Sequence, residues 1–322
     1  MSMFKFNFSN SEDNNVEAAV TETSQDKIID SDLKWLPAVE IIPSNYGSEL
    51  ITEGKWLTKK ISNSDNSIHY LSSESNNSKE IYKTDADIEE AQYEGGFKVW
   101  DCTYHLMNYL CENNPEGTFK GKKVLDLGCG NGFLGILSFY IGAEIVHFQD
   151  YNDSVINKIT IPNTLKNLQS LNDSSVKCKF FAGDWESFSD LDDFKYDIIL
   201  TAATIYNTKS YKKLLSVFKQ KLELSGTVIL AAKSHYFGWG GGTRNFEEFL
   251  QKDGSFLSRT LWTCSEGYCE RQEFKNLLDE AKRIMYLNQH FLSTYKSVLF
   301  GPRCSFLVFD KNISRTLTNQ IS

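Results

Sequence analysis

A run of apolar residues leads into closely spaced glycines in the stretch KKVLDLGCGNGFLG, which is typical of a buried strand, a tight turn and a helix. The spacing is Asp-x-Gly-x-Gly-x-Gly, formed by Asp126, Gly128, Gly130 and Gly132. A dinucleotide site requires a third glycine where this chain has Phe133, and an ATP phosphate loop requires a Gly-Lys-Ser/Thr sequence that does not follow. The turn therefore indicates a nucleoside ligand of another kind.

Acidic residues at the ends of successive predicted strands indicate which ligand that is. The carboxylate of Asp126 suits a ligand with a cationic or amine end, such as S-adenosyl-L-methionine. Asp150 lies about 20 residues beyond the turn, where an acidic group accepts hydrogen bonds from ribose hydroxyls. Asp184 is placed to accept the adenine amino group, and Trp185 to cover the ring. Each feature alone is also ordinary turn chemistry, but three consecutive strands with such ends favour a cofactor site at one sheet edge.

Short apolar segments alternate with segments of helical periodicity in the main part of the chain. We predict strands at Lys123–Leu127, Ile145–Asp150, Cys178–Gly183, Tyr196–Thr201 and Thr227–Ala232. We predict helices at Val99–Asn113, Gly132–Tyr140, Asn152–Asn167 and Ser210–Leu222. Because strands spaced in this way are joined by right-handed crossovers, we expect an α/β fold with a parallel sheet covered on both faces. FLSRTLWTC and CSFLVFD are read as antiparallel closing strands, separated by the helical stretch EFKNLLDEAKRIMYLN.

The 322 residues divide into four predicted parts. Residues 1–30 are rich in Ser, Asn, Asp and Glu, which predicts disorder. Residues 31–92 form an extension with an aromatic-rich flap, which we expect to dock on the main domain, and a Ser/Asn-rich surface loop. Residues 93–310 form the main domain, and residues 311–322 form a tail.

Composition argues against several classes of protein. The net charge of -8 suits a basic protein partner better than the phosphate backbone of a nucleic acid. The chain has no long uncharged apolar run and no apolar signal segment near its start, so we expect no membrane association. Seven scattered cysteines fit a reduced intracellular compartment. Cys264, Cys269 and Cys304 lack the paired spacing of a zinc site, so we expect no metal.

Longer motifs resemble those of the eukaryotic seven-strand protein-histidine N-methyltransferases. Between about Tyr93 and about Gly267, and in the family's order, they are YEGGFKVWDCT, KVLDLGCGNGFLGI, HFQDYN, FFAGDW, YDIILT, TIYN and KSHYFGWGGG. The glycine turn is common to methyltransferases generally, whereas HFQDYN together with HYFGWGGG is narrower and indicates histidine methylation. The resemblance implies a Rossmann-like seven-strand sheet with helices on both faces and an N-terminal extension.

The activity that this resemblance implies is transfer of a methyl group from S-adenosyl-L-methionine to a ring nitrogen of a protein histidine. The acceptor implied by the family is a large-subunit ribosomal protein, which is basic. We expect a monomer in the cytoplasm, the nucleus or both, without direct contact to nucleic acid.

The family's cofactor contacts fall on several of these motifs. Toward the methionine end they are Val99, Trp100, Asp101, Cys102 and Thr103, with Gly128 beneath. Toward the ribose and adenine they are Gln149, Asp150, Tyr151, Gly183, Asp184 and Trp185. Beneath the sulfonium they are Thr201 and Ala202.

Methyl transfer from a sulfonium needs little acid–base chemistry, because the methyl group is already activated and the protein mainly aligns the reactants and excludes water. Neutral imidazole is a competent nucleophile when a hydrogen bond to its other nitrogen selects the tautomer. The candidates for that role are Tyr206 and Asn207. Trp100 could offer a ring face to the sulfonium, an interaction worth about 0.5–2 kcal/mol.

The chain departs from the family at Ala203, which occupies the position of an acidic residue three before Tyr206. Two alternatives therefore stay open: methylation of lysine or another group, and an inactive cofactor-binding partner of a ribosomal protein. An apparent insertion also follows Gly267. HYFGWGGG is read either as a mobile lid with glycine hinges or as a tight turn over packed aromatic rings. His147 and His235 are expected to be structural.

Overall fold

The computed structural model describes residues 34–43, 55–71, 88–113, 117–171, 177–264 and 304–310, the last segment by its backbone alone. The elements given below belong to the unit Trp35–Ser322. Several predictions fall outside the described residues: the start at 1–30, the helix EFKNLLDEAKRIMYLN, the tail at 311–322 and Cys269. The side chains of Cys264 and Cys304 are likewise not described, so the cysteine group after residue 263 stays a prediction.

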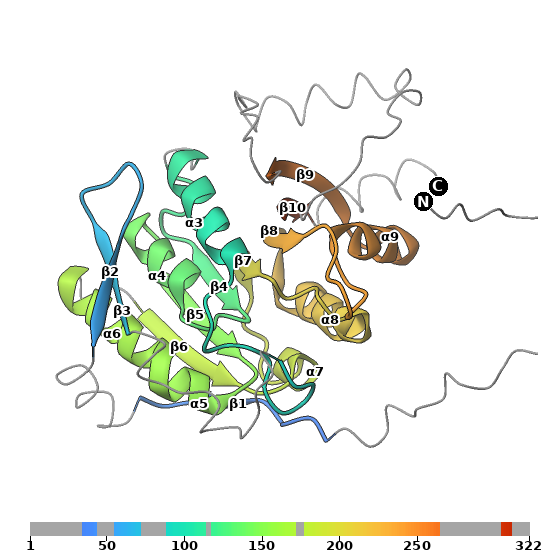
Figure 1. The fold of residues 1–322 in the computed structure, drawn as a ribbon, viewed down its shortest axis with the longest axis horizontal. Coiled ribbons are helices and arrows are strands. Elements are labelled where there is room, and N and C mark those ends of the chain that lie inside the picture. Colours follow the sequence, from blue (N-terminus) through green and yellow to red (C-terminus); the bar gives the residue numbers. More distant parts are fainter. Residues whose placement is uncertain are drawn as a thin grey trace, which may run out of the picture. The chain divides into compact units, whose positions relative to one another are not determined.

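Eight of the described strands form one sheet (Figure 1). They are β1 (Val39–Ile41), β4 (Lys123–Leu127), β5 (Ile145–Asp150), β6 (Lys177–Ala182), β7 (Tyr196–Ala202), β8 (Leu222–Lys233), β9 (Leu257–Cys264) and β10 (Cys304–Asp310). Their order across the sheet is β1-β6-β5-β4-β7-β8-β10-β9. The five strands from β4 to β8 run parallel, and β10 pairs antiparallel with both β8 and β9. The predicted α/β sheet with antiparallel closing strands is confirmed, and β1 adds an eighth strand to the seven read from the sequence.

Strand β4 shows why this sheet must be covered on both sides. Val124 packs in one hydrophobic core, whereas Leu125 and Leu127 pack in the other, because successive side chains of a strand point to opposite faces. All three side chains are fully buried. Burial of an aliphatic side chain of this size stabilises the folded state by about 1.5–3 kcal/mol. The apolar run in this stretch is therefore that of a central parallel strand.

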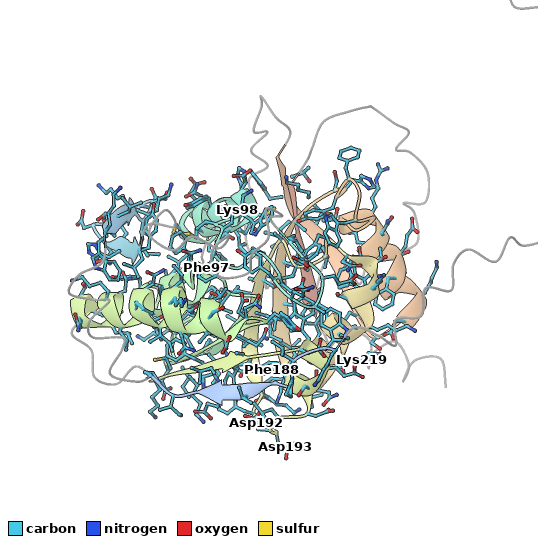
Figure 2. All side chains as sticks on the ribbon, turned by 60° about the horizontal axis from the view of Figure 1, so that its bottom comes forward. Phe97, Lys98, Phe188, Asp192, Asp193 and Lys219 are labelled. Atoms are coloured by element: carbon cyan, nitrogen blue, oxygen red, sulfur yellow. The ribbon has the colours of Figure 1, made fainter. Side chains whose placement is uncertain are left out.

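Helices cover the two faces of the sheet as two groups. The first comprises α3 (Asp101–Asn113), α4 (Phe133–Tyr140) and α6 (Ile161–Leu171), which share one core with the hairpin β2 (Trp56–Lys60) and β3 (Ser67–Leu71). The second comprises α7 (Trp185–Ser189), α8 (Tyr211–Lys221) and α9 (Thr243–Asp253), which share the other core. Figure 2 shows Lys98 beside α3 and Phe188 of α7 toward the opposite side of the sheet. No helix in the described ranges is long and apolar enough to cross a membrane.

The predicted helix Asn152–Asn167 is interrupted in the structure. A short α5 (Asp153–Val155) continues into a π-helical segment, η2 (Ile156–Thr160), before α6 begins. Pro162 lies in the first turn of α6 and has no amide hydrogen to donate, which removes one helical hydrogen bond. In the π-helical segment, the Thr160 hydroxyl donates to the Gly130 carbonyl at 2.7 Å. This hydrogen bond ties the π-helical segment η2 to the glycine turn. Segments of this kind are frequent at functional sites.

The N-terminal extension joins the sheet next to β6. Strand β1 pairs antiparallel with β6, from Val39 opposite Ala182 to Ile41 opposite Phe180 (Figure 1). The Ala38 amide donates to the Ser187 hydroxyl at 2.8 Å, which fixes the segment before β1 against α7. The expected docking of the flap on the main domain is therefore seen as strand addition at the sheet edge.

Candidate functional site

A cavity of about 460 Å³ opens at the carboxyl ends of β4, β5, β6 and β7, the edge at which such sheets bind ligands. The predicted cofactor residues that line it are Val99, Trp100, Thr103, Gly128, Gly130, Asp150, Tyr151, Gly183, Asp184, Trp185 and Ala202. Of the predicted catalytic pair, Tyr206 lines the cavity and Asn207 does not. The structure brings most of the predicted residues together, whereas the role of each toward a ligand stays a prediction.

The turn after β4 needs its glycines for two reasons. Gly128 and Gly130 have φ angles of 66° and 49°, in the left-handed region that disfavours side chains. A Cβ atom at Gly130 would lie 2.9 Å from the Gly96 carbonyl oxygen, so the segment before α3 packs directly on the turn. The backbone of the turn therefore forms the floor of the cavity without a side chain in the way.

Asp150 ends β5 at that floor. One carboxylate oxygen accepts from the Gly130 amide at 2.8 Å, and the other faces the Asn152 amide at 3.4 Å. Burial raises the pKa of the Asp150 carboxyl to about 6, although these backbone amides oppose the shift. The group is thus a buried acceptor at the cavity wall, which fits the predicted contact with ribose hydroxyls.

The structure corrects the prediction for Asp126. Its side chain points to the same face as Val124, because residues two apart in a strand share a face, and it does not line the cavity. The carboxylate accepts from the Gly135 amide of α4 at 2.8 Å. Burial raises the pKa of the Asp126 carboxyl to about 8. Asp126 therefore holds helix α4 against the sheet and does not meet the amine end of a ligand.

Gln149 acts on the cavity through its neighbour Trp185. It does not line the cavity itself; its side-chain oxygen accepts from the Trp185 indole nitrogen at 2.9 Å. Its amide nitrogen donates to the Gly183 carbonyl at 2.8 Å. These two bonds fix the indole ring at the cavity wall, and its contact with adenine stays a prediction.

The Asp184 carboxylate has two protein partners that the sequence does not indicate. One oxygen caps α7 by accepting from the Glu186 amide at 3.1 Å, and the other pairs with the Lys213 ammonium at 2.8 Å. That ammonium also lies 3.6 Å from the ring centroid of Trp35, which comes from the N-terminal extension and lines the cavity. A ligand amino group at Asp184 therefore shares the carboxylate with Lys213.

The segment that leads into α3 supplies the opposite wall. The Trp100 indole nitrogen donates to the Gly95 carbonyl at 3.2 Å, and the Lys98 ammonium lies 4.7 Å from the Trp100 ring centroid. One ring face thus already has a cation over it. Asp101 is exposed and Cys102 is buried in the core under α3, so neither of these two predicted contacts lines the cavity.

Thr201 is a structural residue beneath the site. Its hydroxyl donates to the Leu127 carbonyl at 2.8 Å, which joins the ends of β4 and β7, and it contacts the Thr204 hydroxyl at 2.7 Å. It does not line the cavity, whereas Ala202 and Ala203 do. Ala203 has a φ of 60°, and its methyl group stands at the wall where the family places a carboxylate.

Tyr206 is the predicted catalytic residue that lines the cavity. Its hydroxyl donates to the Glu94 carboxylate, whose other oxygen accepts from the Ala91 amide at 2.8 Å. The Trp239 ring packs edge-on against the Tyr206 ring, with centroids 5.4 Å apart at 88°. Burial raises the pKa of the Tyr206 hydroxyl well above its usual range, so this residue keeps its proton.

Asn207 has a different role from the one predicted. Its side-chain oxygen caps the short helix η3 (Thr208–Ser210) by accepting from the Lys209 amide at 3.0 Å. Its amide nitrogen donates to Glu90 at 2.9 Å. Both ends of the Asn207 amide are therefore occupied by protein groups.

The stretch HYFGWGGG forms a tight turn rather than a free loop. The Gly241 amide donates to the Tyr206 carbonyl at 2.9 Å, and a Cβ atom at Gly241 would lie 2.2 Å from that same oxygen. Tyr236 and Trp239 line the cavity, whereas Phe237 is 83% exposed. The reading as a turn over packed aromatic rings fits this geometry. His147 is structural as expected, since its ring bonds the Tyr196 hydroxyl at 2.9 Å inside the core.

Several residues that line the cavity were not assigned to the site from the sequence. Trp35, Glu94, Lys98, Lys213, Tyr236 and Trp239 all contribute side chains to the wall. Trp35 and Lys213 come from segments far from any motif, so no local signal could have found them. Glu94 had a signal, because a carboxylate directly before two glycines and a predicted helix is placed close to the glycine turn.

These features together fit a nucleoside ligand. Asp150 is an acceptor for a diol, Trp185 offers a fixed aromatic wall, and the glycine turn allows close approach of a backbone floor. A cavity of about 460 Å³ lies within the range of small-molecule sites. Within the described ranges no group of three or more His, Cys, Asp or Glu residues is placed to hold a metal ion.

Comparison with known proteins agrees with this geometry. The family described as lysine methyltransferase matches residues 82–252. A Bos taurus protein named histidine protein methyltransferase 1 homolog is 41% identical over 211 residues, which cover 58% of this chain and 56% of that protein. A Dictyostelium discoideum protein of the same name is 42% identical over 188 residues, with 58% and 59% coverage.

One solved structure with a similar fold is titled a putative SAM-dependent methyltransferase from Streptococcus mutans. It is 12% identical, with a TM-score of 0.45, and the match covers 80% of this chain and 55% of that chain. The chain also spans little more than half the length of the two curated relatives above.

Proposed function

Because this chain belongs to the family described as lysine methyltransferase, we propose that it transfers a methyl group to a nitrogen of a protein side chain, and that this nitrogen belongs to a histidine ring. S-adenosyl-L-methionine is the cofactor. The observation that carries the proposal is one cavity whose wall includes Asp150, Trp185 and Tyr206. When bound, the cofactor supplies an already activated methyl group.

The protein's own contribution to such a reaction is geometric. Asp150, Trp185 and the glycine turn are placed to hold the nucleoside half, and the packed rings of Tyr236 and Trp239 exclude water near Tyr206. Alignment of this kind accounts for a large part of the rate of methyl transfer, because the sulfonium already activates the methyl group.

Histidine is supported as the acceptor by the names of the two relatives at 41% and 42% identity. A neutral imidazole nitrogen can attack directly, provided that its second nitrogen is held by a hydrogen bond. The Tyr206 oxygen is a suitable acceptor for that second N–H, because its own proton is donated to Glu94.

The acceptor protein is proposed to be a basic protein of the large ribosomal subunit, as the resemblance implies. The net charge of -8 supports a basic partner. We propose that the enzyme is a monomer that meets this partner in the cytoplasm, the nucleus or both, without direct contact to nucleic acid.

A lysine acceptor is the second candidate. The description of the family favours it. Ala203 favours it too, because its methyl group lies at the cavity wall where the protein-histidine N-methyltransferases that the motifs resemble have an acidic residue. A neutral amine requires no tautomer selection, so the pair Tyr206–Glu94 is less necessary for this reaction than for imidazole.

The test is incubation of the full chain with labelled S-adenosyl-L-methionine and large-subunit ribosomal proteins, followed by mass mapping of the modified residue. Label on a histidine is the expected result. Label on lysine supports the second candidate. Tight binding of S-adenosylhomocysteine without transfer to any acceptor indicates an inactive partner and overturns the proposed activity.

A further inference from the structure

Glu94 is a carboxylate in the cavity that neither the motifs nor the family description assigns to a task. It precedes Gly95 and Gly96 in the segment before α3, and its side chain is half-buried at the cavity wall. Its backbone amide donates to the Asn152 side chain at 3.2 Å, and Asn152 in turn donates to the Gln92 carbonyl at 2.7 Å. The Asn152 side chain thus holds the backbone at Glu94 in place.

Three carboxylates among the described residues line this cavity, and they differ in their partners. Asp150 accepts from backbone amides, and Asp184 caps a helix and pairs with Lys213. Glu94 accepts from the Tyr206 hydroxyl and the Ala91 amide. Of these three carboxylates, Glu94 is the one that accepts a hydrogen bond from a hydroxyl group.

The charges around Glu94 favour this use. Burial raises the pKa of the Glu94 carboxyl above its usual value, and the nearby Glu90 carboxylate acts in the same direction. Hydrogen bonds from Tyr206 and Ala91, together with the positive charge of Lys213, oppose the shift. The result is a carboxylate of increased basicity, as a proton acceptor requires.

We propose that Glu94 is a positioning residue that acts through Tyr206 to bind the acceptor nitrogen that is not methylated and to receive its proton. This inference rests on the proposed transfer to a histidine ring. The acceptor ring gains the methyl carbon on one nitrogen, and the carbon–sulfur electron pair stays on sulfur. The ring then loses the proton from its other nitrogen to the Tyr206 oxygen, while the Tyr206 proton passes to Glu94.

The arrangement stabilises the reacting ring as well as orienting it. Positive charge develops on the imidazole as its nitrogen bonds the methyl carbon, and the Glu94 carboxylate lies one hydroxyl group away. Preorganised groups of opposite charge stabilise such a transition state in a site that excludes water. The pair also selects one tautomer, so it determines which ring nitrogen faces the methyl group.

The first test compares single-turnover rates of Glu94→Gln, Tyr206→Phe and the double variant on the acceptor labelled in the mapping experiment. Each single variant is expected to lose about 100-fold or more in rate. Rates are compared at saturating S-adenosyl-L-methionine, because the Glu94 and Asp150 carboxylates are close enough to repel each other and the variants are expected to change the cofactor affinity as well. The double variant is expected to be no slower than the slower single variant, because residues that act as one unit are not additive.

The matched control is Glu248→Gln, which removes the same charge from an exposed position on α9. Glu248 does not line the cavity, so this variant is expected to stay within about threefold of the unaltered protein in rate. A Glu94→Gln rate within threefold of that control overturns the proposal. Losses in the two single variants that multiply in the double variant overturn it as well.

The second test needs no turnover. Imidazole and N-methylimidazole are titrated by NMR into the protein saturated with S-adenosylhomocysteine. Imidazole can donate an N–H to Tyr206 and its methylated analogue cannot, so we expect imidazole to bind about tenfold more tightly. Tyr206→Phe should remove this preference, and Glu94→Gln should reduce it, while Glu248→Gln should retain it.

Equal binding of the two probes to the unaltered protein contradicts the proposed role of the pair. The two proposals can fail separately. A preference for imidazole that depends on Glu94, without label on any histidine, supports ring binding by the Tyr206–Glu94 pair and refutes the proposed activity together with the proton transfer that depends on it. Label on a histidine with equal binding of both probes supports the proposed activity and refutes the proposed role of the Tyr206–Glu94 pair.

Discussion

Asp150 shows how one residue serves both the fold and the site. Its carboxylate holds the glycine turn through the Gly130 amide and at the same time forms part of the cavity wall. Burial raises the pKa of this carboxyl to about 6, so it is anionic at neutral pH and gains a proton as the pH falls below that value. An anionic carboxylate accepts hydrogen bonds from ribose hydroxyls better than its protonated form does.

We therefore expect the affinity for S-adenosylhomocysteine to decrease as the pH is lowered from 7 to 5. Asp150→Asn should weaken binding at pH 7 by about 1.5–3 kcal/mol, the cost of losing hydrogen bonds to a charged group, and should flatten the pH dependence. Calorimetric titration at several pH values measures both effects. Asp153→Asn, an exposed carboxylate three residues away, is the control and should behave as the unaltered protein.

An affinity that does not vary between pH 5 and pH 7 would count against Asp150 as the ribose acceptor. The same holds if Asp150→Asn binds as tightly as Asp153→Asn while both melt at the temperature of the unaltered protein. The variant's melting temperature is needed, because the Gly130 hydrogen bond is also altered.

At the scale of elements, strand β1 connects the N-terminal extension to the cavity. The Asp184 amide donates to the Leu36 carbonyl at 2.8 Å, and this contact places Trp35 at the wall. Gly183 permits the close approach, since a Cβ atom there would lie 2.4 Å from the Pro37 carbonyl oxygen. Its φ of 121° also disfavours any side chain.

Gly183→Ala should displace the extension from the end of β6 and so remove Trp35 and the Lys213 contact from the cavity. We expect a loss of about tenfold in affinity for S-adenosylhomocysteine, which corresponds to the free energy of a buried cation–π contact together with its packing. Limited proteolysis should cut near residue 35 more readily in the variant.

Gly254→Ala provides the comparison for this prediction. Gly254 also has a positive φ, of 72°, but nothing lies within 4 Å of the position of its Cβ atom. This variant should lose about 1 kcal/mol of stability from backbone strain and keep its affinity. Equal affinities in the two variants would show that the extension does not contribute to ligand binding.

At the scale of the whole molecule, the net charge of -8 acts on encounter with the acceptor more than on the chemistry. Attraction between an acidic enzyme and a basic protein is screened by salt, with a Debye length of about 10 Å at 0.1 M. The cofactor is bound by local contacts within one cavity, which salt affects much less.

Raising the salt concentration from about 50 to about 300 mM should therefore increase the KM for a basic acceptor several-fold, with little change in the single-turnover rate at saturation. Steady-state kinetics at several salt concentrations measure this. The affinity for S-adenosylhomocysteine in the same buffers is the internal reference. A KM that is insensitive to salt would argue against a basic acceptor.

Much of this molecule could be read from local sequence patterns. The strands β4, β5 and β10 were predicted with the bounds that the structure shows, because apolar runs bounded by turns report directly on buried strands. The glycine turn and the acidic strand ends likewise located the cavity. Alternation along a strand decides which face a side chain meets, and applying it to Asp126 would have predicted its contact with α4.

What local patterns could not decide depends on segments distant in the chain. Trp35 and Lys213 are 178 residues apart in number, and Glu94 and Tyr206 are 112 apart, yet each pair meets at one wall. Asn207 looked equivalent to Tyr206 by spacing, but the turn into η3 directs its amide to Glu90. Residue types and spacings determine the sheet and its ligand-binding edge, because hydrophobic periodicity and turn chemistry are local. The partners of each polar side chain were decided only by the packed chain, because burial brings together groups that no local pattern relates.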